Sequence, residues 1–192
     1  MSTVEQGSAG STAVAERAAV WQIDPSHTLV EFAAKHMMFT TVKGRFGGVT
    51  GTIHWDEQDV TRSSVEADID AATLDTRTDQ RDNHLRSADF LHVEVHPTIR
   101  FRSTRIERAG GDRLKVYGDL TIRDVTREVA LDTTVNGRGK TPFGTEAAGF
   151  TAETSINRKD FGLNWNVALE AGGWLVGDTI KITLEVEAVK QS

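Results

Sequence analysis

Apolar and polar side chains alternate along most of the chain. The pattern is clearest near the end, where Ile180, Ile182 and Leu184 share one face and Lys181 and Thr183 share the other. This period of two is typical of β-strands with one buried face, and a slip of one residue would expose every apolar side chain. Further strands are predicted at residues 21–24, 30–36, 43–55, 64–70, 98–106, 114–123, 129–135 and 150–156.

The segments between these strands predict antiparallel connections. Gly110, Gly111 and Asp112 lie between two strand patterns, as do residues 136–139, which contain two glycines. Glycine supplies the positive φ that tight hairpin turns require. Both segments are therefore predicted to be hairpin loops, and the sheet is predicted to contain about eight strands.

Two segments interrupt the strand pattern. Residues 78–86 are rich in charge and contain no β-branched run after Thr78, which could cap a helix. They predict a helix of two to three turns, ended before Pro97, and a second helical turn is expected at residues 35–39. The predicted fold is all-β: an eight-stranded antiparallel barrel with one short helix across a mouth.

Composition restricts the classes of protein. A chain of 192 residues suits one domain with a core of its own, which we place at residues 20–192 after a flexible tail at residues 1–19. The net charge of −6 argues against nucleic-acid binding, and no cysteine is present for a disulfide. The chain shows neither a secretory signal nor an apolar run of ~20 residues, so a soluble, cytoplasmic protein is expected.

The interior of the predicted barrel favours a ligand. An eight-stranded barrel is either filled by its side chains or holds one small ligand. Small inward residues such as Ala34, Gly118 and Ala152 leave space, whereas large apolar residues gather at loops and strand ends, where they suit an adaptable apolar ligand. The alternative is that these large residues plug the barrel ends.

Catalytic and metal signatures are weak. His92 and His96 have a spacing of four, but in an extended chain they would lie ~13 Å apart, and no HExxH run is present. The chain also lacks cysteine and a Gly-x-Ser-x-Gly elbow. His84 could pair with Asp82, or form an ordinary surface hydrogen bond. Arg158 is expected to pair with Asp160 and close a turn. We predict no metal site, cofactor or catalytic residue.

An ordered series of short motifs covers residues 21–189. It begins with Asp-Pro-Ser-His at 24–27, followed by Phe32, His36 and Phe39. It continues through residues 81–87 (Arg-Asp-Asn-His-Leu-Arg-Ser) and 118–122, and ends with residues 156–163 and Trp165. Each motif is weak alone, but their order and spacing together are specific, and the series resembles the YceI-like family of polyisoprenoid-binding, lipocalin-like barrels. Many relatives carry a secretion signal that is not seen here.

The resemblance implies a lipocalin-like barrel that holds a long isoprenoid chain, such as that of an isoprenoid quinone, in an elongated apolar cavity. We expect non-catalytic binding, transport or storage, with transient membrane contact at most and a possible homodimer formed by pairing two apolar mouths. A lipid-modifying enzyme with a His/Asp or metal site and a filled-barrel protein-interaction module are the alternatives. The candidate ligand-binding residues are Val30, Phe32, His36, Met37, Met38, Phe39, Phe46, His84, Phe90, Phe101, Leu120, Leu131, Phe150, Asn157, Arg158, Phe161, Trp165 and Leu184.

Overall fold

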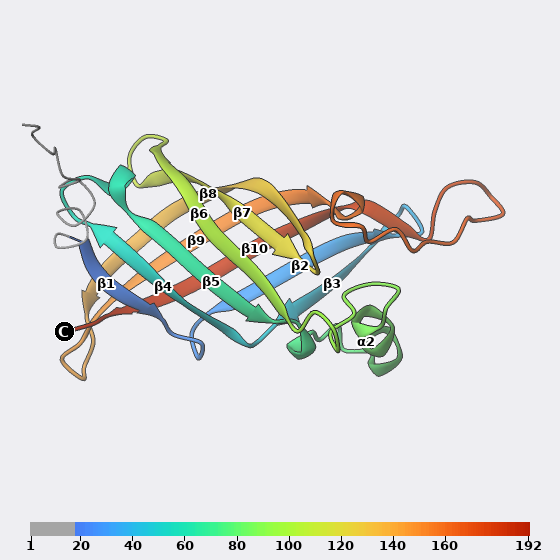
Figure 1. Ribbon diagram of the computed structural model, residues 1–192, viewed down its shortest axis with the longest axis horizontal. Coiled ribbons are helices and arrows are strands. Elements are labelled where there is room, and N and C mark those ends of the chain that lie inside the picture. Colours follow the sequence, from blue (N-terminus) through green and yellow to red (C-terminus); the bar gives the residue numbers. More distant parts are fainter. Residues whose placement is uncertain (1–17) are drawn as a thin grey trace, which may run out of the picture.

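One antiparallel sheet closes on itself over residues 18–192, the part of the chain that this computed structural model describes (Figure 1). Its strands are β1 (Ala18–Ile23), β2 (Leu29–His36), β3 (Thr40–Phe46), β4 (Val49–Asp56), β5 (Ser64–Asp70), β6 (Thr98–Arg108), β7 (Arg113–Ile122), β8 (Val125–Lys140), β9 (Glu146–Asn157) and β10 (Val176–Lys190). The helix α2 spans Asp79–Arg86, and short 3-10 helices lie at Val60–Arg62, Ala71–Thr73 and Arg158–Phe161.

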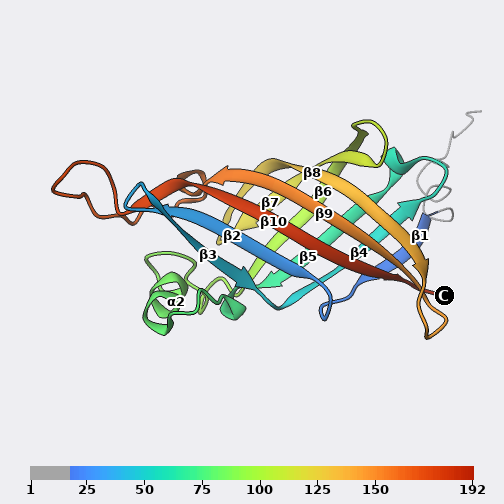
Figure 2. The ribbon, with the colours of Figure 1, turned by 180° about the vertical axis from the view of Figure 1, so that it is seen from behind.

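The ten segments occupy eight positions around the barrel. β1 and β2 follow one another along the same strand, β10: β1 pairs with its last residues, and β2 pairs with Val176 to Glu185. β3 and β4 are likewise paired with β2 and β1, respectively, and β4 also pairs with β5. The ring then continues from β5 to β10 in chain order (Figure 2). The predicted eight-stranded antiparallel barrel is therefore confirmed.

The bend between β3 and β4 lies at Gly47 and Gly48. Both backbone N–H groups donate to Thr73 Oγ1 at 3.2 Å, instead of continuing the strand ladder. A side chain at residue 48 would meet Cβ of Asp70 at 2.9 Å. The single long strand that we predicted at residues 43–55 is wrong in this detail, because this close approach divides it.

One of the two predicted hairpin loops is confirmed and the other is wrong. Gly110 and Gly111 have φ values of 91° and 59° and connect β6 to β7. Residues 136–139, in contrast, lie inside β8, where the pairing with β9 shifts register between Val135 and Gly137. Gly137 therefore belongs to a β-bulge rather than a turn, and the chain reverses at residues 141–145.

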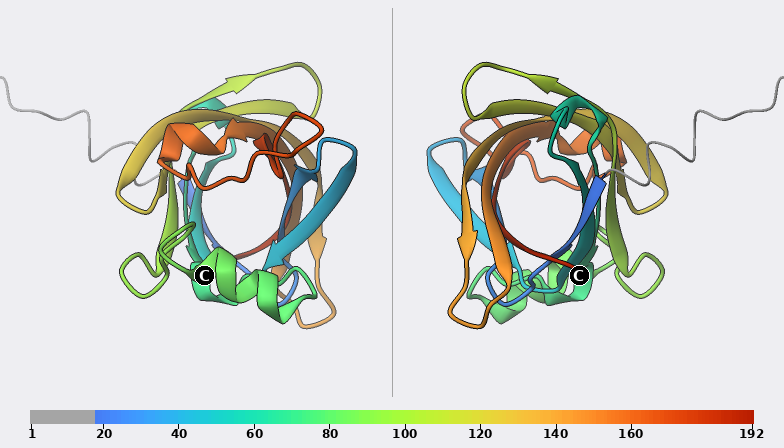
Figure 3. Two further views of the ribbon diagram at one scale, coloured as in Figure 1. Left: turned by 90° about the vertical axis from the view of Figure 1, so that its right-hand side faces the viewer. Right: turned by 90° about the vertical axis from the view of Figure 1, so that its left-hand side faces the viewer.

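The helix α2 lies at one end of the barrel, as predicted, on the opposite side of the ring from the loop at residues 162–175 (Figure 3). Thr78 stands at the N-cap position, but its side chain makes no capping hydrogen bond; its Oγ1 accepts from Arg81 Nη2 at 3.1 Å. α2 is not part of the sheet, and its residues border the barrel opening.

The helical turn predicted at residues 35–39 is wrong. β2 extends to His36, and Met37 and Met38 have φ values of 50° and 68° in the left-handed region. The chain reverses there into β3 through a tight turn, and Met37 N donates to Leu175 O at 2.8 Å. Two non-glycine residues with positive φ are not signalled by sequence pattern.

Residues 1–17 of the predicted tail lie outside the described residues, and Ala18 and Ala19 belong to β1. Among the helices of residues 18–192, none combines the length and the apolar character needed to cross a bilayer.

Candidate ligand-binding cavity

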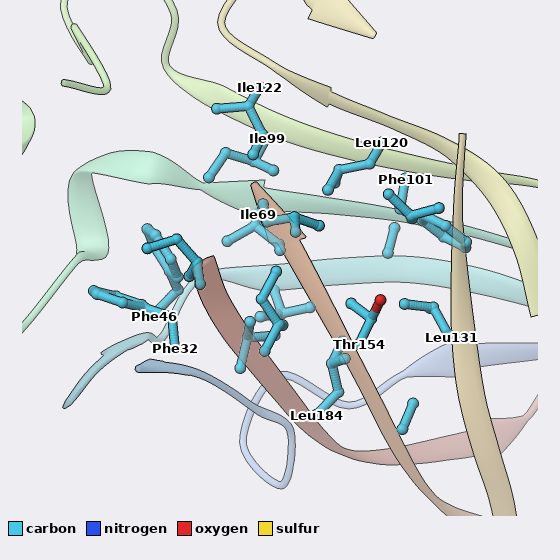
Figure 4. A pocket seen from close by; sticks show the side chains of 18 of the residues that line it. Phe32, Phe46, Ile69, Ile99, Phe101, Leu120, Ile122, Leu131, Thr154 and Leu184 are labelled. Atoms are coloured by element: carbon cyan, nitrogen blue, oxygen red, sulfur yellow. The ribbon is translucent and has the colours of Figure 1, made fainter. Parts of the chain in front are cut away.

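The barrel encloses a cavity of about 820 Å³. The predicted inward faces line it: Val30, Phe32 and Ala34 on β2 alternate with outward residues, and so do the corresponding sets on β7, β8, β9 and β10 (Figure 4). The lining is almost entirely apolar, and Thr154 is one of its few polar members near the middle. The barrel is therefore hollow rather than filled, which favours the ligand-binding alternative over the plugged one.

Two phenylalanines lie along the wall because glycines leave room for them. A Cβ atom at Gly44 would lie 2.3 Å from Phe32 Cζ, and one at Gly118 would lie 2.5 Å from Phe101 Cζ. Each ring therefore covers a glycine on a neighbouring strand, Gly44 being the direct partner of Phe32. The aromatic surface is in this way turned toward the cavity without blocking it.

Tryptophans close the end of the barrel at which the C-terminus lies (Figure 1). Trp21 is fully buried and packs against Trp55, with ring centroids 5.4 Å apart. Trp55 packs in turn against Phe150 at the same centroid distance, and both of these rings line the cavity. Ala148 and Ala188 complete this cluster. The opposite end, beside α2, is therefore the mouth.

At the mouth, His84 packs edge-on against two aromatic rings. Its ring centroid lies 4.5 Å from that of Trp165 and 5.1 Å from that of Phe90. His84 Nε2 lies 2.8 Å from Asp89 Oδ2. The pairing considered with Asp82 is wrong, because the buried Asp82 carboxylate accepts hydrogen bonds from Thr76 instead.

Arg158 is buried, and its side chain joins backbone segments on both sides of the loop at residues 162–175. Its guanidinium donates to the carbonyl oxygens of Leu163, Trp165 (2.9 Å) and Gly177 (3.1 Å). Its acidic partner is Asp178 at 3.1 Å, so the predicted pairing with Asp160 is wrong. Lys159 also donates to Asp178, and this hydrogen bond holds the pKa of Asp178 below its usual value. These contacts of Arg158 hold the two ends of the loop at residues 162–175 in place.

Thirteen of the eighteen candidate residues line the cavity: Val30, Phe32, His36, Phe46, His84, Phe90, Phe101, Leu120, Leu131, Phe150, Arg158, Trp165 and Leu184. Their role toward a ligand stays a prediction. The lining also contains Thr78, Gln80 and Arg81, which sequence reasoning missed. The sequence indicated their place at the cavity only through the helix predicted across a mouth of the barrel.

The structure places five candidates outside the lining. Met37, Met38 and Phe39 stand on the exposed turn after β2, where Phe39 is 72% exposed. Phe161 is buried in the core, and the Asn157 side chain accepts a hydrogen bond from Lys159 N at the start of a 3-10 helix. The first three are exposed because the chain reverses at Met37 and Met38, where β2 turns into β3.

The histidines that we expected to be far apart are neighbours. His92 has a φ of 51°, and its carbonyl accepts from both Val95 N and His96 N, so the chain turns rather than extends. The ring centroids of His92 and His96 are 5.9 Å apart. The spacing argument was wrong because this segment packs against α2, where Val93 N donates to Arg86 O.

Within residues 18–192, one group of three potential metal ligands comes together, and it lies outside the cavity. Asp24, His27 and Glu187 surround the break between β1 and β2, with their ligand atoms within 4.8 Å of one another. His27 Nδ1 lies 2.8 Å from Asp24 Oδ2 and 3.8 Å from Glu187 Oε1. The hydrogen bond and charge of Asp24 raise the pKa of His27, and His27 in turn lowers the pKa of Asp24.

We therefore expect an NMR titration to give His27 a pKa above its usual value of 6.5. Replacing Asp24 with asparagine should bring that pKa back toward 6.5, because the main partner loses its charge. The raised group stabilises the fold below pH 6.5 and the lowered one above pH 3.8, so the pair contributes most between these values. An unchanged His27 pKa in the Asp24→Asn variant would contradict this assignment.

A closed antiparallel barrel with an apolar cavity and a helix at its mouth defines the class of lipocalin-like barrel proteins. The YceI-like domain model matches residues 21–188, and the chain belongs to this family, as the sequence motifs indicated. UPF0312 proteins of Pseudomonas putida and Pseudomonas aeruginosa are 35% and 34% identical, over 91% and 96% of this chain and 88% and 94% of their own length.

Solved structures share the fold. Burkholderia cenocepacia BcnA has a TM-score of 0.75 at 22% identity, covering 86% of this chain and 98% of its own. The Campylobacter jejuni YCEI protein has a TM-score of 0.69 at 28% identity, covering 82% and 90%. A polyisoprenoid binding domain from Saccharophagus degradans has a TM-score of 0.69 at 12% identity, covering 91% and 99%.

Proposed function

We propose that this protein binds a polyisoprenoid lipid in the barrel cavity and acts as a non-catalytic carrier or store. The observation that carries the proposal is the cavity of about 820 Å³ with its almost wholly apolar lining. Such a lining suits a hydrocarbon chain, because burying apolar surface supplies the binding free energy without directional contacts. Membership of the YceI-like family and the fold shared with a polyisoprenoid binding domain support the proposal.

The cavity volume suggests how much of the lipid is enclosed. At ~30 Å³ per water-sized group, about 820 Å³ holds roughly 27 carbon-sized groups, or about five isoprene units. At ~0.3 kcal/mol per heavy atom, this enclosed chain would contribute ~8 kcal/mol, a dissociation constant of about 1 μM. Isoprenoid alcohols, quinones and phosphates all share such a chain and differ in their head groups.

The exposed apolar residues near the mouth bear on how lipid enters. Met38, Phe39 and Trp174 are 55%, 72% and 50% exposed. We propose that they are covered when two mouths pair in a homodimer or when the mouth touches a membrane transiently.

The test is organic extraction of freshly purified protein, expressed in its native host and in a heterologous one, followed by mass spectrometry of the extract. We expect a prenyl species in near-stoichiometric amount, together with a native mass that matches the complex. Empty extracts from both hosts, and no binding of an added prenyl alcohol by the extracted protein, would rule the proposal out.

A further inference from the structure

A turn on the flank of the barrel directs two carboxylates at one imidazole nitrogen. Asp24 and His27 lie on the turn between β1 and β2, away from both ends of the barrel (Figure 1), and Glu187 lies beside it on β10. His27 Nδ1 is 2.8 Å from Asp24 Oδ2 and 3.8 Å from Glu187 Oε1. A hydrogen bond accounts for the contact with Asp24, but 3.8 Å is too long for one with Glu187. The convergence of Glu187 on the same nitrogen therefore needs a second explanation.

The backbone holds the three groups together, although they come from opposite ends of the chain. Asp24 N donates to Glu187 O at 2.8 Å, and Glu187 N donates to Thr28 Oγ1 at 3.3 Å. Ser26 N donates to Asp24 Oδ1 at 2.8 Å, which leaves Oδ2 directed at His27. The fold therefore fixes the positions of the three residues, and only the ends of their side chains have to adjust to a bound ion.

The two carboxylates lack a basic partner. Within residues 18–192, neither Asp24 nor Glu187 forms an ion pair with a lysine or an arginine. Glu187 faces Gly149 across the sheet, which offers no side chain, whereas Glu153 on the same pair of strands is matched by Lys181. A singly charged imidazolium neutralises only one of the two carboxylates. A divalent cation would neutralise both.

The spacing of the three ligand atoms fits a transition-metal ion. All of them lie within 4.8 Å of one another. Zn²⁺ binds imidazole nitrogen and carboxylate oxygen at ~2.0–2.2 Å, so its tetrahedral ligands lie roughly 3.4 Å apart. The distances of 2.8 and 3.8 Å from His27 Nδ1 lie on either side of that value. The side chains of His27 and Glu187 are 66% and 38% exposed, so small rotations bring both to this spacing.

We propose that Asp24, His27 and Glu187 bind one Zn²⁺ ion, with water in the fourth position, and that the ion ties the turn between β1 and β2 to β10. Three protein ligands and one open position are a common arrangement around zinc. Ca²⁺ and Mg²⁺ prefer oxygen ligands alone, so the imidazole selects against them. Lipid binding is not required for zinc binding, because none of the three residues lines the cavity.

Titration calorimetry of the untagged full-length protein with ZnCl₂ tests the site, in a buffer that does not chelate zinc and at about pH 8, where imidazole is deprotonated. We expect one ion per chain, much weaker binding of CaCl₂ and MgCl₂, and a change of the His27 ring signals in NMR spectra. With zinc at about a hundred times its Kd, the Tm should rise by about 5–10 °C, since the folded state alone holds the ligands together. Weak binding of several ions, without saturation at one per chain, would make the zinc adventitious and overturn the proposal.

Glu187→Gln separates a zinc site from a simple Asp24–His27 hydrogen bond. It should weaken zinc binding at least about tenfold, since even the residues behind metal ligands usually contribute that factor. Glu185→Gln is the matched control, because Glu185 is exposed on the same strand and its Oε2 accepts from Thr151 Oγ1. His92→Gln tests the other pair of neighbouring imidazoles. Both controls should bind zinc as the wild type does. Unchanged zinc affinity in Glu187→Gln, or loss of binding in His92→Gln, overturns the proposal.

Discussion

Replacing Arg158 with methionine should lower the free energy of unfolding by about 3–5 kcal/mol, the usual cost of removing one partner from a buried charged network. The side chain is 2% exposed and donates to three carbonyl oxygens besides Asp178. Methionine preserves apolar volume but removes every donor, so the buried carbonyl of Leu163 loses its partner at ~1–3 kcal/mol, and the partly buried carbonyls of Trp165 and Gly177 lose theirs at a smaller cost. Urea denaturation of delipidated protein measures the change.

Lys159→Met is the control for this experiment. Lys159 contacts the same Asp178 carboxylate at 2.9 Å, but its side chain is 44% exposed. An exposed ion pair contributes about 0–1 kcal/mol, so this variant should remain near the wild type. If Arg158→Met also changes stability by less than about 1 kcal/mol, the carbonyl contacts are not what holds the loop at residues 162–175.

The period of two carried most of the fold prediction. It identified the inward faces of β2, β7, β8, β9 and β10, because a closed sheet around an apolar space buries one side of each strand continuously. The alternation of apolar and polar residues did not predict local irregularities of the backbone. The bulge at Gly137 has the same composition as a turn, and the positive φ values at Met37 and Met38 follow from the connection to β3 and the contact with Leu175.

The polar contacts were harder to predict, because they join distant parts of the chain. Asp178 is 20 residues from Arg158, so the nearer Asp160 was the natural but wrong choice. The place of Arg81 in the cavity lining was missed for a related reason. Its side chain is held there by hydrogen bonds to Thr76 and Thr78, which a linear pattern does not display.

A tryptophan in place of Ala152 distinguishes a hollow barrel from a filled one. Ala152 lines the cavity on β9, opposite Leu184 of β10 and Thr133 of β8. In a hollow barrel the indole ring enters free space, so stability should change little, and the added apolar contacts can raise it. The ring should also obstruct the cavity, so that the longest prenyl chain retained after extraction becomes shorter by about one or two isoprene units.

Ala148→Trp provides the matched comparison on the same strand. Ala148 is 2% exposed, packs in the cluster around Trp21 and does not line the cavity. The new ring has no free space there and should destabilise the protein by at least about 1–3 kcal/mol through overpacking. Chemical denaturation and lipid extraction of both variants measure the contrast. If Ala152→Trp is as destabilising as Ala148→Trp, the centre of the barrel is packed in solution. A neutral Ala152→Trp that still retains the full-length chain would place the ligand outside the cavity.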